Sequence, residues 1–293
     1  MTEFFIIMKT LDKRGINMIE KDVINEMNQF QQGVSAYFLE ASKHVDRLAS
    51  DKSIIAFLSS CNKDTSSINA EKYNEVLKVL EKTKCSSNQI FLTFIGIECN
   101  GDQIDNFGIS RQQESQQGLG KVYEVKERSW YKETWNSETP KAPTITLPYK
   151  DKSGSYVISI TKGILDKKGN RLGVVGLDVL VRNIAIKLNT KKHIVILTES
   201  GEIVYNSETY IKDILEKRHN ILLLLEPDVL DIVKSNKTGY TLSKMSSKDC
   251  RLGYGCLVQN KYYLITINEP FYIQTLACKI QMSYPKLFLR FQK

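Results

Sequence analysis

The segment that decides the fold is residues 144–180, TITLPYKDKSGSYVISITKGILDKKGNRLGVVGLDVL. Runs rich in β-branched residues alternate in it with polar, glycine-containing loops, a pattern typical of strands joined by hairpins. The runs lie at 144–149, 155–162 and 172–180. We therefore expect three consecutive antiparallel strands here.

The residues before this segment predict the rest of one module. An apolar run at 89–97 is followed by the turn signal Asn100-Gly-Asp102, and residues 103–108 predict the returning strand. Helices are expected over 71–82 and over 127–136, which carries both tryptophans. Two helices and a five-strand antiparallel meander make an α+β module.

A long amphipathic helix precedes this module. Apolar residues recur at intervals of three and four, which average close to the 3.6-residue turn of an α-helix. They are Ile16, Ile19, Val23, Met27, Phe30, Val34, Tyr37, Ala41, Val45 and Leu48. The helix could continue to Leu58, and its length suggests a stalk, a dimer seam or a spine along two modules.

A second, smaller module is predicted after a short helix near 181–188. Strands at 193–198 and 202–206 flank a turn, a helical stretch covers 207–235, and three further strands follow. The chain is therefore divided into a helix (1–58), a first module (59–188), a second module (189–270) and a tail of unclear structure (271–293).

Composition excludes several classes of protein. The 293 residues are 42% hydrophobic and 25% charged, which is ordinary for a globular chain. The net charge of +8 comes from scattered lysines and arginines, not from a basic block of the kind that binds nucleic acid. No run of about eighteen apolar residues occurs, and the apolar patch at 4–8 is too short to span a membrane, although it could be the tail of a membrane helix.

The six cysteines form no CxxC pair and there are three histidines, so a metal site is not expected. No cofactor is expected either. Cys99 and Cys256 lie at or in predicted strands as buried thiols, and Cys61 could meet Cys85 at the ends of two helices.

The candidate site is the segment Tyr123-Glu-Val-Lys-Glu-Arg128-Ser-Trp130-Tyr131. Arginine offers a planar fork for a carboxylate, and aromatic rings wall a pocket. An aromatic helix packed on a sheet, with a surface arginine, explains the same composition. Asp178 lies within an apolar strand, where a carboxylate is costly unless it is paired or functional.

Several motifs follow one another along the chain: the long helix, the Asn100-Gly-Asp102 turn, the segment 123–131 and the strand that holds Asp178. In this order they resemble those of double Cache sensor domains, the extracytoplasmic ligand-binding domains of bacterial chemoreceptors and sensor kinases. The resemblance covers roughly residues 20–270. It implies two PAS-like modules, each a mainly antiparallel sheet flanked by helices, with the first module distal to the membrane and the second proximal to it.

The resemblance also implies a site, because the amino-acid-binding subgroup carries a signature that this chain matches. The matching positions are Tyr123, Arg128, Trp130, Tyr131, Tyr149, Asp151 and Asp178. Arg128 and Trp130 would hold the ligand carboxylate, Tyr131 and Asp178 would hold its amino group, and the others would complete the pocket.

The resulting prediction is the sensor domain of a membrane receptor that binds an amino acid and pairs with a second copy through its long helix. Membrane attachment is implied by the family. Another ligand (an organic acid, an amine or a purine) and a non-binding dimerisation or scaffold module are the alternatives. No phosphate-binding loop, nucleophile elbow or HExxH motif occurs, so an enzyme is not expected.

Overall fold

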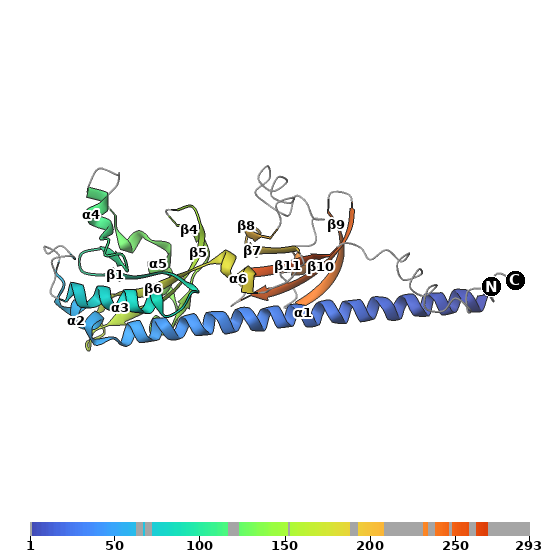
Figure 1. Cartoon of the computed structure of the whole chain (residues 1–293), viewed down its shortest axis with the longest axis horizontal. Coiled ribbons are helices and arrows are strands. Elements are labelled where there is room, and N and C mark those ends of the chain that lie inside the picture. Colours follow the sequence, from blue (N-terminus) through green and yellow to red (C-terminus); the bar gives the residue numbers. More distant parts are fainter. Residues whose placement is uncertain are drawn as a thin grey trace.

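Two antiparallel sheets lie one after the other along a single long helix in the computed structural model of the chain (Figure 1). The structure describes residues 2–62, 67, 72–116, 123–151, 153–187, 193–207, 231–233, 238–245, 248–257 and 262–268. All strand pairs in these residues are antiparallel. The predicted class, an α+β fold with two sheet modules after an N-terminal helix, is confirmed.

The long helix is α1 (Thr2–Ser50), 49 residues or about 73 Å at 1.5 Å per residue. Its predicted apolar stripe is buried from Val23 to Leu48, whereas the side chains of Ile16 and Ile19 lie outside the described residues. Both modules pack against this stripe. From Val23 to Leu48 the stripe is therefore an internal spine of one chain.

The predicted continuation of this helix to Leu58 is wrong, because the chain breaks at Asp51. Its backbone is extended (φ −71°, ψ 128°), and its carboxylate accepts the N–H groups of Ser53 and Ile54 at 2.8 and 3.2 Å. This N-cap starts a separate helix, α2 (Lys52–Ser60).

The first module holds six strands and several helices. They are α3 (Tyr73–Cys85), β1 (Ile90–Ile97), β2 (Gln103–Asp105), α4 (Arg111–Gln116), the 3₁₀ turn η2 (Val125–Glu127), α5 (Ser129–Asn136), β3 (Thr144–Ile145), β4 (Tyr149–Lys150), β5 (Tyr156–Leu165) and β6 (Arg171–Leu180). The strand order is β2-β1-β6-β5-β3, with β4 also paired to β5.

The expected meander is therefore wrong, since β6 lies between β1 and β5. Residues 173–180 of β6 are buried on both faces, and a strand of that kind takes a central place in a sheet. The predicted strand at 144–149 is also split in two. There the Leu147 N–H donates to the Glu133 carboxylate at 3.2 Å, and Pro148 has no N–H to offer to the ladder.

The second module follows α6 (Val181–Lys187). Its strands are β7 (His193–Thr198), β8 (Ile203–Asn206), β9 (Thr238–Met245), β10 (Lys248–Leu257) and β11 (Tyr262–Asn268). Their order, β8-β7-β11-β10-β9, repeats the plan of the first sheet once β3 and β4 are taken as one split strand. The expected helical stretch at 207–235 lies outside the described residues except for Ser207, which is a bend, and residues 231–233, which are helical; the tail at 271–293 also lies outside them.

The modules touch each other at a buried hydrogen bond. Tyr262 of β11, 1% exposed, donates its hydroxyl to the carbonyl of Thr146 in the first module. At the rim, the Tyr156 hydroxyl donates to Glu202 at 3.1 Å. Residues of both sheets belong to one apolar core, so the two modules pack as a unit on α1.

Glycines in the first sheet make room for the two tryptophans of α5. A Cβ on Gly96 would lie 2.7 Å from the Trp130 ring, and one on Gly163 would lie 2.7 Å from Trp135. Real side chains essentially never approach so closely. Helix α5 is thus held tightly against this face of the sheet.

We expect Gly163→Ala to lower the free energy of unfolding by about 1–3 kcal/mol, because the added methyl group overpacks against the Trp135 ring. Denaturant unfolding measures the change. Gly33→Ala is the matched control: nothing lies within 4 Å of that site in α1, and alanine favours helix there. Equal effects of the two substitutions would contradict the close packing.

Candidate functional site

One face of the first sheet is polar where it is not covered by α5. Partners across neighbouring strands share a face, so the pairing of Asp178 with Ser159 and with Leu92 puts these three side chains together. Tyr149 of β4 reaches the same place through its hydroxyl. This patch holds the acidic end of the candidate site.

Asp178 is the central group of the patch. It is 4% exposed, and its Oδ1 accepts the Ser159 hydroxyl at 2.5 Å and the Tyr149 hydroxyl at 3.4 Å. Burial, with the negative charge of Asp151, raises the pKa of Asp178 to about 7, although the hydroxyls and Arg111 act in the opposite direction. The carboxyl therefore changes its charge near neutral pH.

This raised pKa makes folding stability depend on pH. Between about pH 4 and pH 7 the carboxyl is protonated in the folded chain and ionised in the unfolded chain. Its contribution to the free energy of unfolding is therefore full below pH 4 and is lost as the pH rises through about 7. Relative to Asp178→Asn, we expect the wild type to lose about 1 kcal/mol of unfolding free energy per pH unit from pH 5 to pH 7. Urea unfolding at several pH values tests this, and parallel curves for both proteins would contradict it.

The basic end of the site is Arg128, the residue that precedes α5. It is exposed, and its guanidinium carbon lies 5.6 Å from the centre of the Tyr123 ring. The Tyr123 hydroxyl donates to the side-chain carbonyl of Gln103. Burial raises the pKa of Tyr123, while the positive charge of Arg128 lowers it and the charge of Asp178 raises it.

Tyr149 lies between the two ends. Burial and the charge of Asp178 raise its pKa, and the charge of Arg128 lowers it. Both charged groups thus act on the same two phenols, Tyr123 and Tyr149. The structure brings these four predicted residues to one side of the sheet.

Trp130 and Tyr131 are turned into the module. Trp130 is 2% exposed, with its ring centre 4.7 Å from that of Phe94 and 5.6 Å from that of Tyr131. The Tyr131 ring continues to Trp135 at 6.2 Å. The aromatic packing that also explained the motif is therefore present, together with the exposed arginine.

The Tyr131 hydroxyl is not brought to Asp178. It donates to the Glu98 carboxylate, whose other oxygen lies 2.9 Å from Lys126 Nζ. Asp178 pairs with Leu92 on the neighbouring strand. Glu98 lies six residues beyond Leu92, and six residues of extended chain span about 20 Å. Glu98 and the Tyr131 hydroxyl therefore lie towards the opposite end of the strand.

Asp151 has the contacts of a turn residue. Its Oδ1 accepts the Ser155 N–H at 2.9 Å and the Ser153 hydroxyl at 2.7 Å. Its charge nevertheless raises the pKa of Asp178. It shapes the hairpin and adds negative potential at the acidic end.

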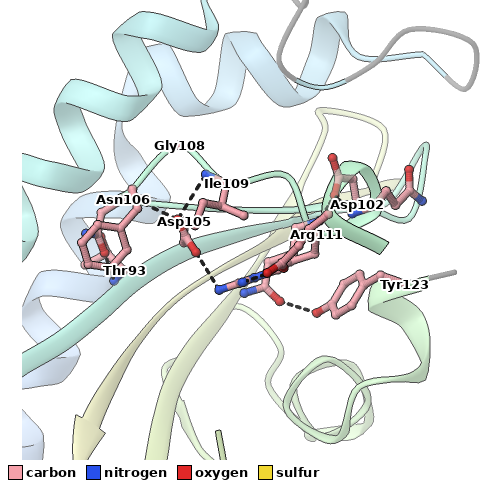
Figure 2. A network of polar contacts seen from close by, with 12 residues as sticks. Thr93, Asp102, Asp105, Asn106, Gly108, Ile109, Arg111 and Tyr123 are labelled. Carbon is pink, nitrogen blue, oxygen red and sulfur yellow. Dashed lines mark hydrogen bonds and ion pairs between the residues drawn. The ribbon is translucent and has the colours of Figure 1, made fainter. Parts of the chain in front are cut away.

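A neighbouring polar network was missed by the sequence analysis (Figure 2). Asp105, with a fully buried side chain, forms an ion pair with Arg111 at 2.7 Å and accepts the N–H groups of Phe107 and Ile109. Arg111 also pairs with Glu114 at 2.9 Å. Its charge reaches the site, since it lowers the pKa of Tyr123.

The sequence carried a partial signal for this network. Asp105 stands in a predicted strand, where a carboxylate is unusual, and Arg111 follows in a stretch of polar residues without a periodic pattern. Among the described residues no group of three histidine, cysteine or acidic side chains could hold a metal ion. In the same part of the chain, no helix has the length and apolar character needed to cross a bilayer.

The comparisons with known proteins agree with the fold of this chain. Residues 69–186 match the family model described as methyl-accepting chemotaxis protein-like, first PDC sensor domain. No curated protein matches the sequence.

Two solved structures illustrate the similarity. The sensory domain of the Campylobacter jejuni chemoreceptor Tlp3, with isoleucine bound, is 17% identical with a TM-score of 0.61, over 85% of this chain and 91% of that one. The ligand-binding domain of the Pseudomonas aeruginosa amino acid chemoreceptor PctC, in complex with GABA, is 14% identical with a TM-score of 0.56, over 85% and 99%. The resemblance to double Cache sensor domains is confirmed at the level of the fold, and the family match covers the first module.

Proposed function

We propose that this chain, which has the double Cache fold, is an extracytoplasmic sensor domain of a bacterial signal-transduction receptor and that it binds an amino acid in its first module. The observation that carries this proposal is that one buried acid, Asp178, and one exposed base, Arg128, both act on the phenols of Tyr149 and Tyr123. A zwitterion matches such a two-ended site, because each of its charges meets the opposite charge.

The carboxylate of the ligand would bind Arg128, whose fork can donate two parallel hydrogen bonds. Trp130 would line the carboxylate end of the pocket. The ring of Tyr123 positions the guanidinium of Arg128, which lies over it. The ammonium group would bind Asp178, which is then ionised, with Tyr149 beside it.

Two residues of the predicted set have less direct roles in this arrangement. Asp151 would add negative potential at the ammonium end. Tyr131, whose hydroxyl is bonded to Glu98, would contribute its ring to the aromatic support of Trp130. The ammonium contact therefore falls to Asp178 and Tyr149.

Related structures support an amino acid over the alternatives. Tlp3 and PctC are described with isoleucine and GABA, ligands that carry both an amino and a carboxyl group. An organic acid would use Arg128 and leave Asp178 without a counter-charge, and an amine would leave Arg128 unused. A scaffold without a ligand gives no reason for a carboxyl as buried as Asp178.

The test is a thermal-shift screen with the L-amino acids, followed by calorimetric titration of the best one, its decarboxylated amine and its keto acid. We expect the amino acid to bind and both analogues to bind at least tenfold more weakly, which is 1.4 kcal/mol. Equal binding of the amine would exclude Arg128 as the carboxylate site. The absence of any shift across the screen would favour the scaffold.

We also propose that the domain belongs to a membrane receptor and forms a homodimer through α1. The buried stripe does not supply the seam, so the contact would use another face of the helix. A hollow of about 540 Å³ lies on that helix, and the exposed Leu39 is one of its lining residues: Asn28, Gln31, Gln32, Ser35, Ala36 and Leu39. Sedimentation of the wild type and of Leu39→Glu tests this, and a wild type that stays monomeric at high concentration would defeat it.

A further inference from the structure

The end of α2 and the turn after β1 bring two cysteines together. Cys61 follows the last residue of α2 as its C-cap, and its N–H donates to the Phe57 carbonyl at 3.1 Å. Cys99 lies two residues beyond Ile97, the last residue of β1. The two side chains lie close enough for each thiol to shift the pKa of the other, and both are half-buried and pack against the main core. Cys85, the residue predicted to meet Cys61, is exposed at the end of α3.

Contacts on either side of the two cysteines fix this arrangement. One helical turn before the first cysteine, Leu58 packs over Gly173, whose strand partner is Ile97. Beyond the second cysteine, the side-chain amide of Asn100 donates to the Ser67 hydroxyl at 2.9 Å. The last turn of α2 is thus held on β6 beside the end of β1, and Ser67 holds the turn after β1, both without the thiols.

We propose that Cys61 and Cys99 form a disulfide bond, which joins the end of α2 to the turn between β1 and β2. The occurrence of this bond in the cell rests on the proposed extracytoplasmic function, because disulfides persist in oxidising compartments. The turn carries Asp102, which accepts the Ser110 hydroxyl at 2.6 Å and the Gln112 N–H at 3.0 Å. The bond would therefore brace the segment that leads into α4 and the Arg111 network.

Oxidation needs an acceptor, and a protein or small-molecule disulfide supplies it by exchange. The Cys99 thiolate attacks one sulfur of the acceptor and expels the first thiolate. The Cys61 thiolate then attacks the Cys99 sulfur and expels the second. One S–S bond forms in the chain while one breaks in the acceptor, and two electrons and two protons pass to the acceptor, which leaves as two thiols.

The surroundings favour Cys99 as the first nucleophile. Burial raises the pKa of the Cys99 thiol, but the neighbouring Cys61, hydrogen bonds from the backbone and the positive charge of Lys126 offset part of this rise. Burial raises the pKa of Cys61 to about 12, so this thiol reacts second, within the mixed disulfide.

The experiment incubates the reduced chain of residues 1–293 with oxidised glutathione, blocks the remaining thiols and maps the peptides by mass spectrometry without reduction. We expect a peptide pair linked through Cys61 and Cys99 and lighter than its parts by two hydrogen atoms. It should persist in Cys85→Ser and disappear in Cys99→Ser. Reduction should lower the melting temperature of the wild type by about 5–10 °C and leave that of Cys99→Ser unchanged.

Free thiols at both positions after oxidation, or a bridge from either of them to another cysteine, would overturn the proposal. A melting temperature that reduction does not change would also count against a bond that braces the fold. Amino acid binding is measured on the same oxidised sample. A bridge without any binding would reject the sensor function and leave the disulfide, while binding without a bridge would do the reverse.

Discussion

Asp178→Asn is expected to weaken amino acid binding by 30-fold or more. The substitution keeps the shape of the side chain and its contact with the Ser159 hydroxyl, but it removes the charge that would pair with the ligand ammonium. Loss of one member of a desolvated charge pair typically costs about 2–5 kcal/mol, and 1.4 kcal/mol is a factor of ten in affinity. Calorimetric titration measures the change.

The pH dependence of binding gives this prediction a second, independent readout. Asp178, with a pKa of about 7, must lose its proton to pair with an ammonium group. Wild-type affinity should therefore rise about tenfold from pH 6 to pH 8, because the ionised fraction rises by that factor. Titrations in two buffers with different ionisation enthalpies should show a proton released on binding at pH 6. The Asn variant should show neither effect.

Asp151→Asn is the matched control, since it removes a nearby carboxylate whose contacts belong to the hairpin. We expect a much smaller loss of affinity and a lower pKa at Asp178, which moves the rise in affinity to lower pH. A wild type whose affinity is flat between pH 6 and pH 8, together with full binding by Asp178→Asn, would show that the carboxyl does not hold the ligand.

Local patterns in the sequence predicted most elements of the fold. The apolar periodicity of α1 and the glycine-containing loops around β5 and β6 depend on near neighbours, so they are visible in the sequence. The break at Asp51 was not predicted, although an aspartate before Lys52-Ser-Ile54 is an N-cap signal. The place of β6 between β1 and β5 was not visible, since it depends on pairing between strands about eighty residues apart.

The same distinction applies to the site. The resemblance predicted Tyr123, Arg128, Tyr149 and Asp178 as one site, and the structure places them on one side of the sheet. Hydrogen-bond partners were beyond prediction, because they come from other elements: Ser159 reaches Asp178 across a strand pair.

Arg111 and Glu98 were missed for a similar reason. Arg111 reaches Asp105 because the chain reverses at Gly108, which has a φ of +75°. Glu98 receives the Tyr131 hydroxyl because α5 lies across the sheet, so the geometry of a helix against a strand decides this contact. Neither relation has a periodic signature in the sequence.

Arg128→Ala should lower amino acid affinity by 30-fold or more and change what the site selects. The guanidinium is the carboxylate fork in the proposed function, and its loss removes two charge-assisted hydrogen bonds. The decarboxylated amine never used that fork, so its affinity should change little. The ratio of amino acid to amine affinity should therefore collapse towards one in the variant.

Two further variants separate the fork from mere positive charge. Arg128→Lys keeps the charge and loses the planar pair of donors, so it should restore part of the affinity but not all of it. Arg171→Ala removes another cation of the first module, one that lies 4.7 Å from the Trp135 ring, and should leave selectivity unchanged.

If Arg128→Ala weakened the amine and the amino acid equally, the residue would act by holding Tyr123 and α5 in place. The carboxylate would then have to bind elsewhere on this face, where Arg111, held between Asp105 and Glu114, is the cation to test next, since its charge acts on Asp178 and Tyr123.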